Sequence, residues 1–272
     1  MEDQATGASG INKPLVGVAA AVVLAAVGGW YYWHTRSAPP ETPAAAAPVV
    51  QAPPPDAPIE HPVPAAGPDA AVAPLPSLAD SDSVLSDAIG GAAPDSGLMQ
   101  YVVPESLIRH IVVTVDNLPR PKAAADKRPT TPVAGTFVVD GDELHATIDA
   151  QNFQRYGPMV EALRKTDMRK LAAVYLHFYP LFQKVYQDLG YPNGYFNDRL
   201  VKVIDVLLAA PQVPAPIELV RPNVLYVFSD PALEARPSGQ KMLIRMGPDN
   251  AAIVKAKLTE LRALVTAAPP RR

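Results

Sequence analysis

The sequence predicts a mainly α-helical fold with a small β-hairpin, a single compact domain behind a transmembrane helix and a disordered Pro/Ala-rich linker. Apolar residues recur every three to four positions over most of residues 77–266, which is typical of amphipathic helices. Two strand-like segments flank Asp140-Gly141, a pair favoured in tight hairpins. Near the start, residues 14–33 contain no charged side chain. As a helix this run would span roughly 30 Å, the thickness of a bilayer's hydrocarbon core.

Composition divides the chain into five parts. We expect an N-terminal tail, a transmembrane helix, a disordered linker, a folded domain and a disordered C-terminal tail, at residues 1–13, 14–33, 34–76, 77–266 and 267–272. The fourth part is long enough for one domain with a hydrophobic core of its own.

A cleaved secretory signal and a buried core helix are the alternatives for the apolar run. A signal needs a basic start and a shorter apolar run, yet Glu2 and Asp3 precede this one. Polar sequence on both sides disfavours a core helix. The far end, Trp30–Trp33, is followed by Arg36, which is typical of an interfacial aromatic belt with a cationic flank. We therefore expect an uncleaved single span.

Charge does not fix the orientation of this span, because Lys13 and Arg36 lie on opposite sides of it. A short N-terminal tail before a large C-terminal part fits a single-pass inner-membrane protein whose C-terminal domain lies in the periplasm. The chain contains no cysteine, so it can fold in an oxidising or a reducing compartment.

The linker is dominated by proline. Residues 38–76 contain thirteen prolines and no lysine or arginine. Such a composition buries too little apolar surface to offset ordering entropy, and proline favours the polyproline conformation. We interpret the stretch as a spacer, although Pro53–Pro55 would also suit the aromatic groove of a partner. From Ser77 onward basic and acidic residues nearly balance, so we expect no nucleic-acid partner.

The first half of the domain is predicted to contain two helices, a proline-rich loop and the hairpin, at residues 81–89, 104–118, 120–136 and 136–148. Ser81 or Asp82 suits the N-cap of the first helix, and Gly90 suits its end. Pro104 is a favoured first-turn residue for the second helix. The strands of the hairpin are expected on either side of Asp140-Gly141.

The second half is predicted to contain five helices, with short extended pieces at 217–228; the helices are expected at 152–165, 167–189, 196–209, 238–246 and 248–265. Gly157-Pro158 is expected to weaken the first of them. Asp167 can cap the second, and Gly190 stands where a C-cap glycine is favoured. The whole is mainly helical with a small β component.

The order of four segments resembles a known family. They read LPSLADSDSVLSDAIGG, YVVPESLIRHIVVTVDNLP, HFYPLFQKVYQDLGYPNGYFNDRLVKVIDVLLAAP and GQKMLIRMGPDNAAIVKAKLTELRALV. Together they resemble a bacterial membrane-anchored family catalogued as domain of unknown function 3014, over Leu75 to about Val265. The resemblance implies an N-terminal anchor, a Pro/Ala-rich spacer and a C-terminal domain in a Gram-negative cell envelope. It implies no activity, cofactor or site residue.

Aromatic and polar residues are concentrated between Tyr175 and Arg199. As structure, the aromatics would fill the core and Asn197 or Asp198 would cap a helix. As a binding site, a groove with aromatic faces, amides and a guanidinium would suit a sugar ring or a peptide. The candidate ligand-binding residues are Tyr191, Tyr195, Asn197, Asp198 and Arg199.

One catalytic pattern occurs, the S-x-x-K of Ser238 and Lys241, in which a lysine one turn later can activate the serine. Its S-D-N and K-T-G companions are absent from the sequence. The structural interpretation is that Ser238 caps a short helix and Lys241 is a solvated side chain. We assign no catalytic residue.

Acidic and histidine residues give no further catalytic or metal signature. Carboxylate pairs for glycoside hydrolysis could arise among Asp198, Asp205, Glu218 and Glu234, but no spacing singles out a pair. The three histidines of the folded part show no metal-ligand spacing, so we expect no metal and no cofactor.

Two functional hypotheses follow from the sequence. The favoured one is a membrane-anchored, non-enzymatic envelope module that binds a protein partner or the peptidoglycan of the cell wall, because anchor and spacer accompany no catalytic signature. The alternative is a wall-directed hydrolase or transferase that uses Ser238 and Lys241 or a carboxylate pair. The hydrolase or transferase hypothesis that uses Ser238 and Lys241 requires both side chains to open into a pocket with an oxyanion site, whereas the binding-module hypothesis does not.

Overall fold

The computed structural model describes residues 58–64, 74–122, 126–142 and 145–266. The predicted transmembrane helix at 14–33 and both predicted tails lie outside these residues. Within the described ranges, no helix has the length and apolar character needed to cross a membrane.

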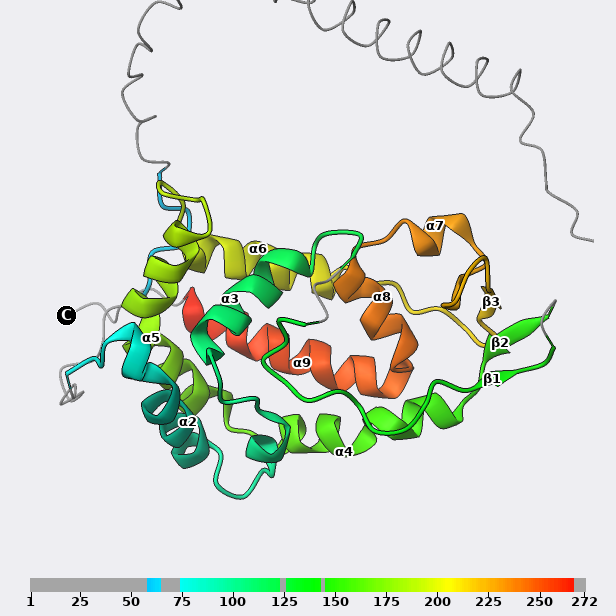
Figure 1. Cartoon of the computed structure of the whole chain (residues 1–272), viewed down its shortest axis with the longest axis horizontal. Coiled ribbons are helices and arrows are strands. Elements are labelled where there is room, and N and C mark those ends of the chain that lie inside the picture. Colours follow the sequence, from blue (N-terminus) through cyan, green and yellow to red (C-terminus); the bar gives the residue numbers. More distant parts are fainter. Residues whose placement is uncertain (1–57, 65–73, 123–125, 143–144, 267–272) are drawn as a thin grey trace, which may run out of the picture. The chain divides into compact units, whose positions relative to one another are not determined.

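The domain is mainly helical, as predicted, with a small antiparallel sheet (Figure 1). Its α-helices are α2 (Ser81–Ala92), α3 (Leu107–Asn117), α4 (Gln151–Lys165), α5 (Met168–Asp188), α6 (Phe196–Leu208), α7 (Pro231–Glu234), α8 (Ser238–Arg245) and α9 (Pro248–Val265). Two short 3₁₀ helices, η1 (Leu78–Asp80) and η2 (Leu98–Tyr101), flank α2. The strands are β1 (Val139–Asp140), β2 (Ala146–Ile148), β3 (Glu218–Val220) and β4 (Val227–Phe228).

The sheet is larger than the predicted hairpin. Its order is β1-β2-β3-β4 with every neighbouring pair antiparallel. The β1–β2 hairpin is confirmed, with Val139 opposite Ile148. Its connection runs over residues 141–145, however, so a two-residue turn at Asp140-Gly141 is wrong. The piece predicted at 217–228 supplies β3 and β4, because Leu219 pairs with Ala146 and both side chains are buried in one cluster.

Two helices run through residues that the sequence analysis expects to interrupt them. α4 continues through Gly157-Pro158, and α2 continues past Gly90 and Gly91 to Ala92. The reason in α2 is tertiary packing, because Ile89 and Ala92 are both buried on the side that faces the domain. Burial on one face outweighs the low helix propensity of two glycines.

Capping explains the ends of α5 and the start of α3. The Asp167 side chain accepts a hydrogen bond from the Arg169 N–H at 2.9 Å, so the predicted cap is confirmed. Gly190 follows α5 with a φ of 106°, a conformation that favours glycine. Helix α3 begins at Leu107 rather than at the predicted Pro104, because a side chain of another helix accepts hydrogen bonds from the N–H groups at its start. The Asp82 carboxylate in α2 accepts hydrogen bonds from the N–H groups of Ser106 (2.6 Å) and Leu107 (2.9 Å).

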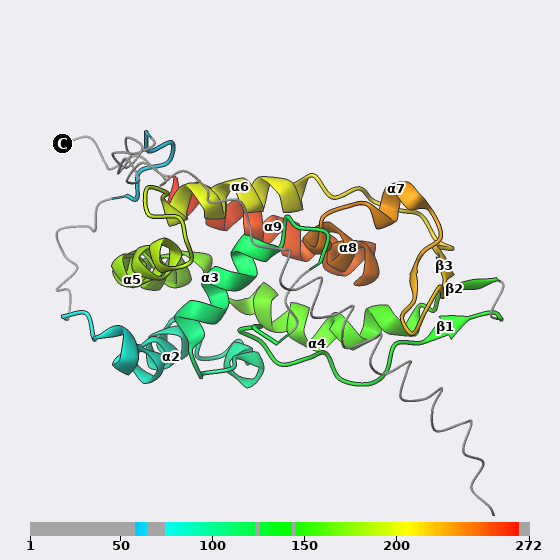
Figure 2. The same ribbon diagram turned by 45° about the horizontal axis from the view of Figure 1, so that its top comes forward.

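Helix α9 is the central element of the domain. It contacts α4, α5, α6 and α8, and Figure 2 shows it between α6 and α4. One hydrophobic cluster joins α2, α3, α5 and the first residue of α6. A second lies beneath the sheet and includes Ile244 of α8, and a third joins α6, α8 and α9. The start of α6 therefore lies where the largest cluster meets the C-terminal end of α9.

Candidate functional site

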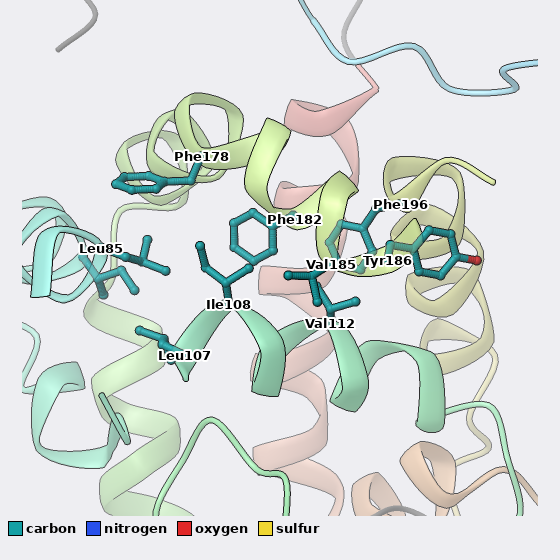
Figure 3. Packing of buried hydrophobic residues seen from close by; sticks show 10 residues of the cluster. Leu85, Leu107, Ile108, Val112, Phe178, Phe182, Val185, Tyr186 and Phe196 are labelled. Carbon is teal, nitrogen blue, oxygen red and sulfur yellow. The ribbon is translucent and has the colours of Figure 1, made fainter. Parts of the chain in front are cut away.

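The aromatic residues of the predicted cluster pack into the largest hydrophobic core. The rings of Phe182 and Phe196 are stacked, with centroids 5.7 Å apart and planes within 5°. Phe178 and Phe196 are each 1% exposed, and Figure 3 shows Phe182, Phe196 and Tyr186 close together above Val112 and Val185. These rings hold α5 and α6 together, so the structural interpretation is confirmed for them.

Polar side chains of α5 hold the connection between α5 and α6. The Gln183 amide donates to the carbonyl oxygen of Gly194 at 2.7 Å and accepts from the Phe196 N–H at 2.8 Å. The Tyr175 hydroxyl donates to Asn197 Oδ1 at 3.0 Å. Burial raises the pKa of Tyr175, and burial also raises the pKa of Tyr179 to about 12. Both hydroxyls therefore stay protonated at neutral pH and act as donors.

Tyr191 and Arg199 belong to a network around a buried carboxylate. Asp116, near the end of α3, is 5% exposed. Arg199 donates to its backbone oxygen at 2.7 Å and forms a 3.0 Å ion pair with Oδ1. Arg120 donates to Asp116 Oδ2, and the Tyr191 hydroxyl lies 3.3 Å from the same oxygen. The Tyr191 ring is stacked on Tyr186 with a centroid distance of 4.5 Å.

Asn197 and Asp198 contact a different part of the chain, residues 58–64, here termed the strap. Asp198 accepts hydrogen bonds from the N–H groups of Glu60 (3.1 Å) and His61 (2.6 Å). The Asn197 amide donates to the carbonyl oxygen of His61 at 2.9 Å. Part of the expected linker at 34–76 is thus bound to the domain, through Glu60 and His61.

The five candidate ligand-binding residues are neighbours that serve two different contacts. Tyr191 and Arg199 face Asp116, whereas Asn197 and Asp198 face the strap. Tyr195 is the partly exposed residue before α6, and its carbonyl oxygen accepts from the Arg199 N–H at 3.1 Å. The structure therefore brings the five together at the start of α6, where most of their polar groups already have partners.

Ser238 and Lys241 make structural contacts in different directions. The Ser238 hydroxyl is buried and donates to the carbonyl oxygen of Leu118 at 3.2 Å. Lys241 is 12% exposed at its side chain and forms a 2.6 Å ion pair with Glu234. Because Lys241 Nζ donates to the backbone oxygen and the carboxylate of Glu234, it is not placed to act as a base for Ser238. The predicted cap and the predicted solvated lysine are both wrong, because the serine anchors α8 to the end of α3 and the lysine is mostly buried.

Two of the four candidate acids, Asp205 and Glu234, are paired with basic side chains. The hydrogen bond from Arg262 holds the pKa of Asp205 below its usual value. Burial raises the pKa of Glu234, but the hydrogen bonds from Lys241 and from the Phe228 N–H together outweigh burial. The net effect is a pKa below the usual value for glutamate. A general acid at neutral pH needs a raised pKa, so neither carboxyl suits that role. Among the described residues, no three His, Cys, Asp or Glu side chains are grouped to hold a metal ion.

An exposed apolar loop between β3 and β4 was not predicted from the sequence. Its tip carries Val224 and Leu225, which are 77% and 75% exposed. Phe137 and Tyr226 lie beside it with ring centroids 6.3 Å apart. The available signal was Pro222-Asn223, because one or two short extended pieces were expected around Arg221-Pro222.

Comparison with known proteins identifies a family. The family model described as "Protein of unknown function (DUF3014)" matches residues 107–262, which is more than half of the chain. The chain belongs to the DUF3014 family. No curated protein and no solved structure matches the chain. The DUF3014 match begins at the first residue of α3 and ends inside α9, so it includes the start of α6 and the β3–β4 loop but excludes α2 and the strap.

Proposed function

We propose that the chain is a single-pass inner-membrane protein whose C-terminal domain lies in the periplasm and acts as a non-enzymatic binding module for a protein partner. The charge-free run at 14–33 and the proline-rich residues 38–76 support an anchor and a spacer. The layout that the family resemblance implies, an anchor, a spacer and a C-terminal domain, supports export. The domain would then act at a distance from the membrane that the spacer sets.

The exposed apolar loop carries the proposal of binding. Val224 and Leu225 are adjacent, uncharged and about three-quarters exposed, and Val220 and Phe137 nearby are also exposed. Aliphatic side chains at a loop tip contribute nothing to the core, and clustered exposed apolar residues mark interaction sites. The two most exposed side chains are aliphatic and bury well against protein, whereas the aromatic Phe137 beside them is only 38% exposed. The loop therefore favours a protein over the cell-wall polymer.

The contacts of the candidate catalytic residues argue for a non-enzymatic role. Ser238 donates to a backbone carbonyl oxygen, Lys241 is neutralised by Glu234, and Asp205 is paired with Arg262. These partners would have to be broken before any of the three could act on a substrate. The hydrolase or transferase alternative has no supporting geometry at these residues.

The location of the domain is tested by protease digestion of spheroplasts that express the full chain with a C-terminal tag. We expect protease to remove the tag without cell lysis, because the large C-terminal part would be exported. A cytoplasmic reporter protein, which must survive in the same sample, is the control. A tag that is digested only after lysis would place the domain in the cytoplasm and contradict the localisation.

The role of the loop is tested with the double substitution Val224→Ser/Leu225→Ser. Burial of each aliphatic side chain contributes about 1.5–3 kcal/mol, so we expect affinity for the partner to fall roughly tenfold or more. The measurement is quantitative cross-linking and co-purification of envelope proteins with the full-length chain. Val84→Ser on α2, at a side chain that is 44% exposed, is the matched control and should leave recovery unchanged.

Equal recovery of every co-purified protein by the double variant and the control would refute the loop as the binding surface. Co-sedimentation with purified peptidoglycan that survives the double substitution would favour the cell wall as ligand instead. Either result leaves the fold and the family membership as they are.

A further inference from the structure

The strap is bound to the domain mainly through its backbone. One carboxylate, that of Asp198, accepts from the N–H groups of two successive residues, Glu60 and His61. One amide, that of Asn197, donates to the carbonyl oxygen of His61. Because these contacts use backbone atoms, they place no requirement on the side chains at the two positions. What they require is a chain that turns so that two successive N–H groups face one carboxylate.

The domain itself holds the two receiving side chains in place. Asn197 is 0% exposed. Its Oδ1 accepts from the Tyr175 hydroxyl at 3.0 Å, and its amide nitrogen also donates to the Val265 carbonyl oxygen at 3.1 Å. Asp198 lies in the first turn of α6, where the helix dipole stabilises a negative charge. The site is therefore pre-formed by α5, α6 and the end of α9, and the strap adds to it without building it.

A surface hollow extends from the strap along one face of α6. It has a volume of about 440 Å³ and is lined by Glu60 and His61 of the strap together with Asp198, Lys202, Asp205, Val206 and Ala209. The α6 residues are spaced three and four apart, so they share one helix face. The hollow offers contacts to peptide side chains beyond those that the strap makes.

Few contacts hold the strap. Pro58, Ile59 and Glu60 are exposed, and Ile59 is an aliphatic side chain that remains 48% exposed. Three hydrogen bonds at a partly exposed surface must offset the conformational entropy that the segment loses when it binds. The prolines at 58, 62 and 64 restrict the free segment and so reduce this loss only in part. A segment held in this way can leave its site while the domain stays folded.

We propose that Asn197 and Asp198 form a peptide-binding site whose resident ligand is the strap, and that the same site takes a proline-containing peptide in trans when the strap is displaced. Recognition is of the backbone: the carboxylate binds two successive N–H groups, the amide binds the following carbonyl oxygen, and the proline after it limits the conformations of the free peptide. This site is distinct from the β3–β4 loop, so it adds to the proposed function and does not depend on it.

The test uses full-length chains in detergent micelles and a fluorescein-labelled peptide with the sequence of residues 56–66. Glu60→Pro/His61→Pro vacates the site by removing both N–H donors of the strap, and leaves Asn197 and Asp198 unchanged. Fluorescence anisotropy should show the vacated chain binding the peptide at least about tenfold more tightly than the wild type, in which the tethered strap competes at a high effective concentration. Glu60→Ala, which retains both donors and the His61 side chain beside Asp205, is the control and should behave as the wild type.

Two further measurements make each outcome decisive. Adding Asp198→Ala to the vacated chain should weaken peptide binding at least tenfold, and hydrogen exchange of residues 58–64 in the wild type should accelerate at least tenfold with Asp198→Ala alone. Exchange of the wild-type strap at the rate of an unstructured peptide would show that it is no resident ligand. Peptide binding that is equal in the vacated and wild-type chains, or that ignores Asp198→Ala, would equally overturn the proposal. None of these results depends on Val224 or Leu225.

Discussion

The substitution Phe196→Ala is expected to lower the free energy of unfolding by about 4 kcal/mol, within the range for a large aromatic removed from a tight core. Phe196 is 1% exposed and is stacked on Phe182, and its ring also lies 5.7 Å from that of Tyr186. Removing it leaves a cavity where α5 meets α6, and three aromatic partners, Phe182, Tyr186 and Tyr175, lose their contacts at once. Urea unfolding of the full-length chain, followed by near-ultraviolet circular dichroism, measures the change.

Phe196→Leu is the matched control, because leucine keeps most of the apolar volume. We expect it to cost about 1 kcal/mol. If the alanine variant lost no more stability than the leucine variant, the stacked arrangement of Phe182 and Phe196 would not be what joins α5 to α6.

Asp116→Ala should have the second-largest effect, a loss of about 3 kcal/mol. Asp116 is almost fully buried, and its carboxylate accepts from Arg120 and forms a 3.0 Å ion pair with Arg199. The substitution leaves the Arg199 guanidinium, whose side chain is only 21% exposed, without its carboxylate. The substitution also removes the carboxylate that accepts from the Tyr191 hydroxyl, so the connection between α5 and α6 is held less firmly to α3.

Asp205→Ala provides the comparison, because Asp205 also pairs with an arginine, at 2.6 Å from Arg262, but at an exposed surface. An exposed pair contributes at most about 1 kcal/mol. The two variants are compared by urea unfolding at the same pH and ionic strength. Similar losses in both would mean that burial of Asp116 has no energetic consequence and would contradict the assigned network.

The helices were predictable where the signal is local. The apolar period of residues 167–189 and 196–209, the cap at Asp167 and the glycine at 190 each act within a few residues, and the structure places α5 and α6 there within one residue at each end. The family resemblance was also found from sequence, although its match covers 107–262 and not the whole stretch from Leu75.

Features that depend on distant parts of the chain were not predictable from one sequence. The start of α3 is set by Asp82 from another helix, and β3 completes a sheet with a strand some seventy residues earlier. The same limit applied to the candidate sites. Ser238 resembles a nucleophile in its local pattern, and only the packing of α8 against α3 shows that its hydroxyl is bound to Leu118. The strap was missed because its proline-rich composition predicts a spacer, whereas Asp198 and Asn197 bind its backbone atoms.

The position of α9 determines when during synthesis the domain folds. α9 is the last of the described helices along the chain, and α4, α5 and α6 all contact it. These three helices therefore lack a common packing partner until α9 has been synthesised, and short helices without tertiary packing are only marginally stable in water. Folding of the domain can be completed only after α9 has left the ribosome.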